Sequence, residues 1–168
     1  MSATKRMASA FEAHGAWVLR TLRCLGVPER ELEDARQDVF EVALRRGAEV
    51  ENLRAWMYGI CLRKALARRR DAARRREEPE ALDARASEPE QEKALARAQA
   101  LTRALAILET LDDEKRAVLV LYEVEQLTMA EVAAVVGCPL QTAYARLYAA
   151  RREVEAVLRR ERARGRDE

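Results

Sequence analysis

The sequence predicts an all-α fold made of two small helical domains joined by an acidic linker, with a helix-turn-helix in the C-terminal domain. Three observations lead to this prediction. Apolar residues recur three and four positions apart along most of the 168 residues, and no stretch alternates apolar and polar residues as a half-buried strand would. Aromatic residues make up only 5% of the chain, which favours helices with cores of Ala, Leu and Val. The charge changes sign sharply near residue 77.

The first domain is predicted to cover residues 7–76 and to contain three helices. The first helix ends at the break Gly26-Val27-Pro28, and Pro28 suits the opening turn of the next one. The second helix, ELEDARQDVFEVALRR, sets an apolar stripe against an acidic face, and Gly47 is expected to end it. The third helix, NLRAWMYGICLRKALARRR, becomes basic towards its end.

Residues 77–100 are predicted to form the linker. Seven acidic residues and two prolines lie between Glu77 and Glu92, against a single arginine, and large apolar residues are almost absent there. Such a segment cannot bury enough apolar surface to fold by itself. Order is expected to resume near Ala94.

The second domain is predicted to cover residues 101–162. Asp112 and the two acidic residues after it are expected to open a helix, because acidic side chains suit its positive N-terminal end. The segment Ala117–Tyr122 is apolar on all sides, so this helix should be buried centrally. Thr128 and Glu131 then form a capping-box pattern at the start of a short helix.

A helix-turn-helix is predicted around Gly137, which stops that short helix, and Pro139, which follows it. The last helix turns Ala143, Leu147 and Ala150 inward. Its opposite face carries Gln141, Thr142, Tyr144, Ala145, Arg146, Tyr148, Arg151 and Arg152. The second helix of such a motif enters the DNA major groove, where Gln pairs with adenine and Arg with guanine or phosphate. The alternative is a helical hairpin with a solvated charged face.

A second candidate nucleic-acid site follows the aromatic residues of the third helix. Seven Arg and one Lys stand between Arg63 and Arg76, against only Asp71. Aromatic rings beside cations suit single-stranded nucleic acid, whose bases stack and whose phosphates are neutralised. Trp56 lies on the apolar stripe and is expected to pack in the core, whereas Tyr58 lies off it and should be available. A solvated helix end is the alternative interpretation of the basic run.

Several classes of protein and site are disfavoured. Cys24, Cys61 and Cys138 are far apart and His14 is the single histidine, so no metal site and no cofactor are predicted, and reduced thiols fit a cytoplasmic protein. No apolar run approaches the length of a membrane span, so no membrane insertion is expected. No pairing of nucleophile and base indicates an enzyme.

Taken in order, three segments resemble the sigma-70 family of bacterial RNA polymerase sigma factors, in its small extracytoplasmic-function class. ELEDARQDVF resembles the family's acidic helix, and LRAWMYGICLRKALARRR resembles its segment that melts the promoter and reads the minus-ten element. The stretch from Leu111 to Leu158, which begins LDDEKRAVLVLYEVEQL, resembles the domain that reads the minus-thirty-five element. The resemblance implies a protein without chemistry of its own that binds core RNA polymerase and promoter DNA.

The resemblance also implies roles for individual residues. The acidic helix would dock on the clamp helices of the polymerase's largest subunit through Asp34, Gln37, Asp38 and Phe40. The minus-ten segment would contact DNA through Tyr58, Arg63, Lys64 and Arg68. The face from Gln141 to Arg152 would read the minus-thirty-five element. The family often has Asn at Arg63, an aromatic residue at Leu44 and Lys or Arg at Tyr144, so the promoter sequence stays open.

A sigma-like protein that titrates an anti-sigma factor without reading DNA is the alternative function. Such a protein would be expected to lack a cationic recognition face, and Arg146, Arg151 and Arg152 argue against it. The sequence leaves open whether the chain itself has an anti-sigma partner.

Overall fold

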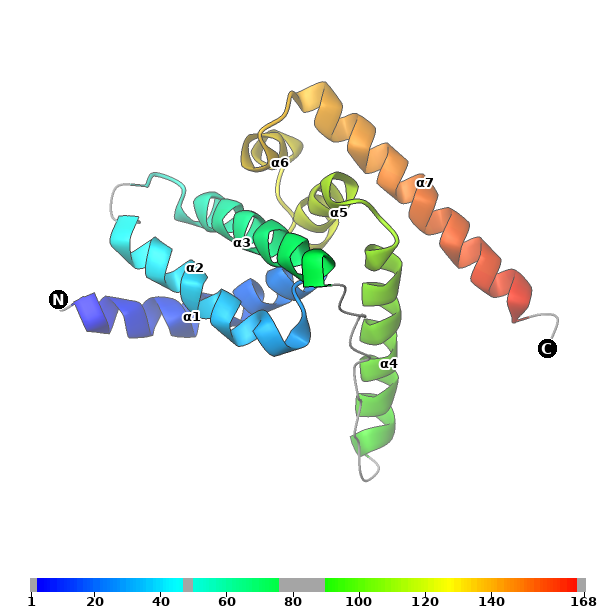
Figure 1. Ribbon diagram of the computed structural model, residues 1–168, viewed down its shortest axis with the longest axis horizontal. Coiled ribbons are helices and arrows are strands. Elements are labelled where there is room, and N and C mark those ends of the chain that lie inside the picture. Colours follow the sequence, from blue (N-terminus) through cyan, green and yellow to red (C-terminus); the bar gives the residue numbers. More distant parts are fainter. Residues whose placement is uncertain (1–2, 47–49, 76–89, 166–168) are drawn as a thin grey trace.

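The computed structural model describes residues 3–46, 50–75 and 90–165, and every regular element in these ranges is helical, as predicted (Figure 1). The first domain contains α1 (Ala3–Cys24), the short 3-10 helix η1 (Glu29–Glu31), α2 (Leu32–Arg46) and α3 (Leu53–Arg75). The remaining elements are α4 (Glu90–Glu109), α5 (Asp113–Leu119), the π-helical turn η3 (Val120–Val124), α6 (Met129–Val136) and α7 (Leu140–Arg164).

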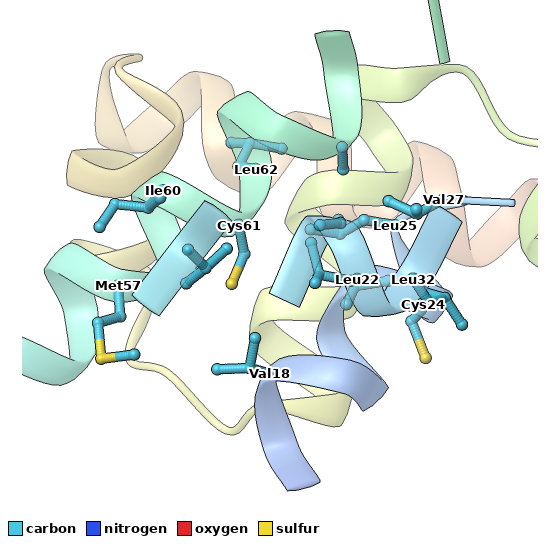
Figure 2. Packing of buried hydrophobic residues seen from close by; sticks show 14 of the residues in the cluster. Val18, Leu22, Cys24, Leu25, Val27, Leu32, Met57, Ile60, Cys61 and Leu62 are labelled. Carbon is cyan, nitrogen blue, oxygen red and sulfur yellow. The ribbon is translucent and has the colours of Figure 1, made fainter. Parts of the chain in front are cut away.

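The core of the first domain lies between α1, α2 and α3. Val18 and Leu22 of α1 lie beside Ile60 and Cys61 of α3 (Figure 2). Val39 of α2 belongs to the same cluster, and all five residues are at most 2% exposed. Each helix contributes residues spaced three or four apart, which is the spacing that places side chains on one face. The predicted break after α1 is present, and Gly26 takes the left-handed conformation there with a φ of +88°.

Helix α4 begins at Glu90, so residues 90–100 are helical where the sequence pattern suggested linker. The reason lies in composition: EQEKALARAQALTRALAILE contains no Gly or Pro and consists mostly of strong helix formers. Pro89 directly precedes it, in keeping with the preference of proline for helix starts. The rest of the predicted linker, residues 77–89, lies outside the described residues, as does Gly47.

The second domain is organised around the segment that was expected to be buried. Ala117, Val118, Val120 and Leu121 are at most 3% exposed. Asp112 caps α5, where its carboxylate accepts a hydrogen bond of 2.9 Å from the Lys115 backbone N–H. The π-helical turn that continues α5 was not predicted, because an apolar segment this short has the same pattern whether its hydrogen bonds span four residues or five.

The two domains are packed against each other, with α3 beside α6 and the start of α5 (Figure 1). Ala117 and Val120 of the second domain join the core of the first. Conversely, Tyr58 of α3 packs with Val118 and Leu121 in the core of the second domain. The two domains therefore share buried apolar surface, and their contact is part of the fold.

A set of arginine contacts joins α3 to the start of the second domain. Arg69 of α3 donates to Asp113 at 2.7 Å and to Glu109 at 3.0 Å. Arg116 of α5 is 1% exposed and donates to the carbonyls of Leu108, at 2.8 Å, and Leu111, at 3.2 Å. These bonds fix the corner between α4 and α5 against the end of α3.

Candidate nucleic-acid and polymerase interfaces

The helix-turn-helix predicted from the sequence is formed by α6 and α7. The Thr128 hydroxyl accepts from the Glu131 backbone N–H at 3.3 Å, and the Thr128 backbone N–H donates to the Glu131 carboxylate at 2.8 Å, which confirms the capping box. Gly137 ends α6 in the left-handed conformation, with φ of +72° and ψ of +43°. A side chain at Gly137 would meet no atom within 4 Å, so the backbone conformation alone favours glycine.

Helix α7 is anchored on one side and open on the other. Ala143, Leu147 and Ala150 are at most 1% exposed and pack towards α5 and α6. The opposite side is exposed at Gln141, Tyr144, Ala145, Tyr148 and Arg152, and Thr142 is half-buried. The structure therefore brings these six predicted residues together on the accessible side of α7.

Two tyrosines give the open side of α7 an aromatic flank. The Tyr144 and Tyr148 rings are stacked with their centroids 6.2 Å apart and their planes at 23°. Their exposed fractions are 37% and 52%. The two rings form an aromatic surface about one helical turn long on the open side of α7.

The other two predicted cations lie at the margins of this face and are paired within the protein. The Arg146 guanidinium contacts the Glu114 carboxylate at 2.8 Å. Arg151 donates through Nε to Glu123 at 2.8 Å, and its guanidinium lies over the Tyr122 ring at 5.7 Å. Ala145 is exposed on the same face.

On the first domain, the predicted DNA-binding cations and a predicted polymerase-binding acid pair with one another. Asp38 of α2 accepts from Arg68 at 2.9 Å and lies 3.5 Å from Lys64, both on α3. Burial raises the pKa of the Asp38 carboxyl, but Arg68 and Lys64 more than offset this and lower it. Arg63 is exposed. These pairs hold α2 to α3, so Asp38 and Arg68 have a structural role in this arrangement.

Two of the predicted site residues are buried. Phe40, expected on the docking face of α2, is 2% exposed and packs in the core of the first domain. Asp34 and Gln37, by contrast, are exposed on α2. The acidic helix therefore presents its polar residues outward, and Phe40 supports it from inside.

Tyr58, expected to be available for DNA, has no exposed surface. It lies off the apolar stripe of α3, as predicted, but this side of α3 faces the second domain. Its hydroxyl donates to Glu125 at 2.8 Å, and its ring centroid lies 4.7 Å from that of Trp17. Trp56, for which core packing was expected, is half-buried against the core of the first domain.

The acceptor of that hydrogen bond, Glu125, is a residue that sequence reasoning missed. Its side chain is fully buried at the end of η3. It accepts from Arg20 through Nη2 at 2.7 Å and Nε at 3.1 Å, and from the hydroxyls of Thr21 and Tyr58 at 2.8 Å each. Arg54 donates to its backbone carbonyl at 3.4 Å. All four partners belong to α1 and α3, so Glu125 joins the domains.

The protonation of this contact can be derived from its surroundings. Burial raises the pKa of Glu125, but the hydrogen bonds from Arg20, Tyr58 and Thr21 outweigh it and bring the pKa below its usual value. Burial and the hydrogen bond to Glu125 raise the pKa of Tyr58 to about 12. At neutral pH the Glu125 carboxylate is therefore ionised and the Tyr58 phenol is protonated. In these states the phenol can donate its hydrogen bond to the carboxylate.

A pH dependence of stability follows. Because its folded pKa is lowered, Glu125 contributes stability that is complete above its ordinary pKa, about 4.3, and is lost as the pH falls below it. We therefore expect the difference in melting temperature between the wild type and Glu125→Gln to be largest near neutral pH and to shrink below about pH 4. A difference that stays constant from pH 7 to pH 3 would contradict this assignment.

The described residues offer no group of three His, Cys, Asp or Glu side chains that could hold a metal ion. Cys24 and Cys61 are buried and Cys138 is half-buried, all as free thiols. Within the described ranges, no helix has the length and apolarity needed to cross a membrane.

The architecture and the open face of α7 define a helical protein with a helix-turn-helix of the DNA-binding type. Comparison with known proteins makes the class specific. Residues 101–154 match the family model described as Sigma-70, region 4. No curated protein sequence matches the chain.

Two solved structures resemble the chain along most of its length. CnrH, solved in complex with the cytosolic domain of CnrY, is 25% identical with a TM-score of 0.70, over 92% of this chain and 88% of that one. The sigma factor RpoE of Bartonella quintana, solved with the anti-sigma factor NepR, is 21% identical with a TM-score of 0.65, over 89% and 96%. The second likeness concerns the fold alone. Residues 101–154 therefore resemble region 4 of the sigma-70 family, and the chain as a whole shares its fold with CnrH and with the sigma factor RpoE.

Proposed function

We propose that this chain is a sigma factor, which binds core RNA polymerase through its first domain, residues 7–76, and reads the minus-thirty-five element through its second, residues 101–162. The observation that carries the proposal is the coincidence of two independent findings. The segment that matches sigma-70 region 4 contains the helix-turn-helix, and the open side of α7 is the side that such a motif turns to the major groove. In this proposal the chain acts by binding and carries out no catalysis. It acts in the cytoplasm, because polymerase and promoters are found there.

The polymerase-binding face is centred on the exposed residues Asp34 and Gln37 of α2. Asp38 lies one turn along the helix and is 38% exposed at its side chain, so it can serve both α3 and a partner. An acidic helix fits a basic partner surface, and charges of this kind govern association rate and specificity. Phe40 stabilises the helix from the core.

The minus-ten element is assigned to α3. Arg63 is exposed and can contact DNA without rearrangement. Lys64 and Arg68 would need to exchange their carboxylate partners for phosphates. The exchange costs little stability for the half-exposed Lys64. Arg68, whose side chain is 17% exposed and which also lies 3.6 Å from Glu31, would give up part of the contact between α2 and α3. Tyr58 becomes available only when the domains separate.

The residues on the open side of α7 suggest how the minus-thirty-five element is read. Gln141 can pair bidentately with adenine, and the methyl groups of Thr142 and Ala145 can contact the thymine methyl. Arg152 is exposed at the edge and suits a phosphate. Arg146 and Arg151 start from internal ion pairs, so they would engage DNA after giving up Glu114 and Glu123.

A comparison of Gln141→Ala with Arg152→Ala tests these assignments. Gln141→Ala should relax discrimination at one base pair by about 1–3 kcal/mol and leave the others unchanged. Arg152→Ala should weaken binding to all sequences alike and reduce the salt slope by about one unit. The measurement is binding of the holoenzyme to duplexes that vary one base pair at a time, at several salt concentrations. Equal effects of Gln141→Ala on every duplex would contradict its reading role.

Use of both promoter elements requires the domains to move apart. Sites read from one side of the duplex lie about 34–36 Å apart or a multiple of this. In the structure the domains share buried contacts around Tyr58 and Glu125, and these contacts are incompatible with wide separation. An anti-sigma partner that binds the packed arrangement would keep it inactive, and one of the similar structures is a sigma factor bound to an anti-sigma factor.

Selection of DNA by the holoenzyme tests the proposal. Core polymerase mixed with the chain should retain, from a pool of random duplexes, a set with two common elements at fixed spacing. If core polymerase binds the chain but the pool is not enriched, the chain is a titrating sigma-like protein.

A further inference from the structure

We propose that Glu125 occupies a phosphate pocket for single-stranded DNA on the first domain, formed by Arg20, Thr21, Arg54 and Tyr58. The inference rests on the proposed function and adds to it. It adds Arg20, Thr21 and Arg54 to the residues that contact DNA. It also means that the Glu125 carboxylate, which belongs to the second domain, competes with promoter DNA for this pocket.

The pocket belongs to the first domain. Its side-chain donors all come from the first domain: Arg20 and Thr21 from α1, Arg54 and Tyr58 from α3. The Thr21 hydroxyl also lies 2.8 Å from the Trp17 carbonyl, so its single proton is shared between that carbonyl and Glu125. Tyr58 is fixed by Arg54, which donates to its hydroxyl at 3.2 Å. Thr21 and Tyr58 each have no exposed surface while Glu125 and the second domain cover them.

The donor set suits a phosphate. The Arg20 guanidinium presents two parallel N–H groups to the two oxygens of Glu125, the fork that also binds phosphate. Two hydroxyl donors complete the set, and Arg54 adds a second positive charge close by. A phosphate carries the same charge as a carboxylate and more acceptor oxygens, so it can accept the bonds that Glu125 accepts.

The neighbouring rings favour single-stranded DNA over other anions. Trp17 and Tyr58 lie with centroids 4.7 Å apart and planes at 46°, directly beside the pocket. The Arg54 guanidinium lies 5.7 Å from the Tyr58 ring centroid. Aromatic rings next to cations are the combination that binds unpaired bases together with their phosphates. An acidic peptide or free phosphate would pair with Arg20 and Arg54 but would make no stacking contact with Trp17 and Tyr58.

In the packed arrangement the pocket is closed to DNA. Glu125 is held in place by its own chain, and a tethered group acts at an effective concentration in the millimolar range or above. Separation of the domains would withdraw Glu125 and uncover Tyr58 in one step. DNA binding to the first domain and domain separation are therefore coupled.

The experiment measures binding of the full chain to a fluorescent single-stranded oligothymidylate by anisotropy at low salt. The wild type should bind weakly, and Glu125→Ala should bind at least ten times more tightly. Glu155→Ala is the matched control, because it removes one carboxylate from an arginine, Arg159, in the same domain but away from the pocket. It should leave the affinity nearly unchanged. In the double variant Glu125→Ala/Arg54→Ala most of the gain should be lost.

A second variant and two competing anions test whether the domains have separated and which ligand the pocket prefers. Glu125→Lys should separate the domains by repulsion from Arg20 and Arg54, and exposure of Tyr58 to the solvent can be followed by iodination. If Tyr58 becomes reactive and the oligothymidylate still binds no more tightly, the proposal is wrong. The same holds if inorganic phosphate or polyglutamate displaces the probe as well as unlabelled oligothymidylate does. Promoter-dependent transcription by the wild type separates failure of this inference from failure of the proposed function.

Discussion

Asp34→Lys is expected to weaken binding of the full chain to core RNA polymerase by at least about 30-fold, equivalent to roughly 2 kcal/mol. Asp34 is exposed in the first turn of α2, on its acidic face, so reversal replaces an attraction to a basic partner by repulsion. The fold should be unaffected, because the side chain lies outside the core. The dissociation constant can be measured by anisotropy of the labelled chain with purified core polymerase.

Glu155→Lys is the control for this prediction. It changes the net charge by the same amount on an exposed helix position of the second domain, where the side chain is 70% exposed. It should leave polymerase binding within a factor of a few. An equal loss of affinity in both variants would show that net charge, and not the α2 face, determines binding.

Ala145→Glu is expected to abolish selective binding to the minus-thirty-five element. Ala145 is the small residue at the centre of the open side of α7, and a glutamate there would place a negative charge against base edges and phosphates. We expect a loss of at least about 3 kcal/mol, more than one mismatched base pair commonly costs. Gel shifts of the holoenzyme on a selected duplex would measure it.

Ala104→Glu provides the matched comparison, since it makes the same change at an exposed position of α4. Both variants should retain helical circular dichroism spectra and bind core polymerase normally. Normal promoter selection by Ala145→Glu would show that α7 approaches DNA with another side, and the assignment of Gln141 and Thr142 would then be wrong as well.

Local features of the sequence predicted the elements of the second domain well. Thr128 and Glu131 are three residues apart and cap α6 with each other, and Gly137 needs only its own backbone conformation to end that helix. The continuous apolar segment from Ala117 is buried, since a helix that is apolar on all sides has no face that favours water. Each of these signals acts within one or two helical turns.

Contacts between distant segments could not be predicted in this way. Tyr58 is buried because Glu125, 67 residues away, accepts its hydroxyl. In the sequence, Glu125 looks like the exposed Glu123 two positions before it, and only the packing of the first domain distinguishes them. The pairing of Asp38 with Arg68 is a second such contact. The sequence predicted polymerase as the partner of Asp38 and DNA as the partner of Arg68, whereas in the structure the two side chains bind each other.

Run-off transcription with purified core polymerase tests the central claim most directly, that this chain directs promoter-specific initiation. The template would be a pool of fragments selected by the holoenzyme, and the chain, Asp34→Lys and Ala145→Glu would be compared. The account predicts transcripts of defined length only when the unaltered chain is present, and neither variant should support them. Tight binding of the chain to core polymerase without a defined transcript from any selected fragment would contradict it.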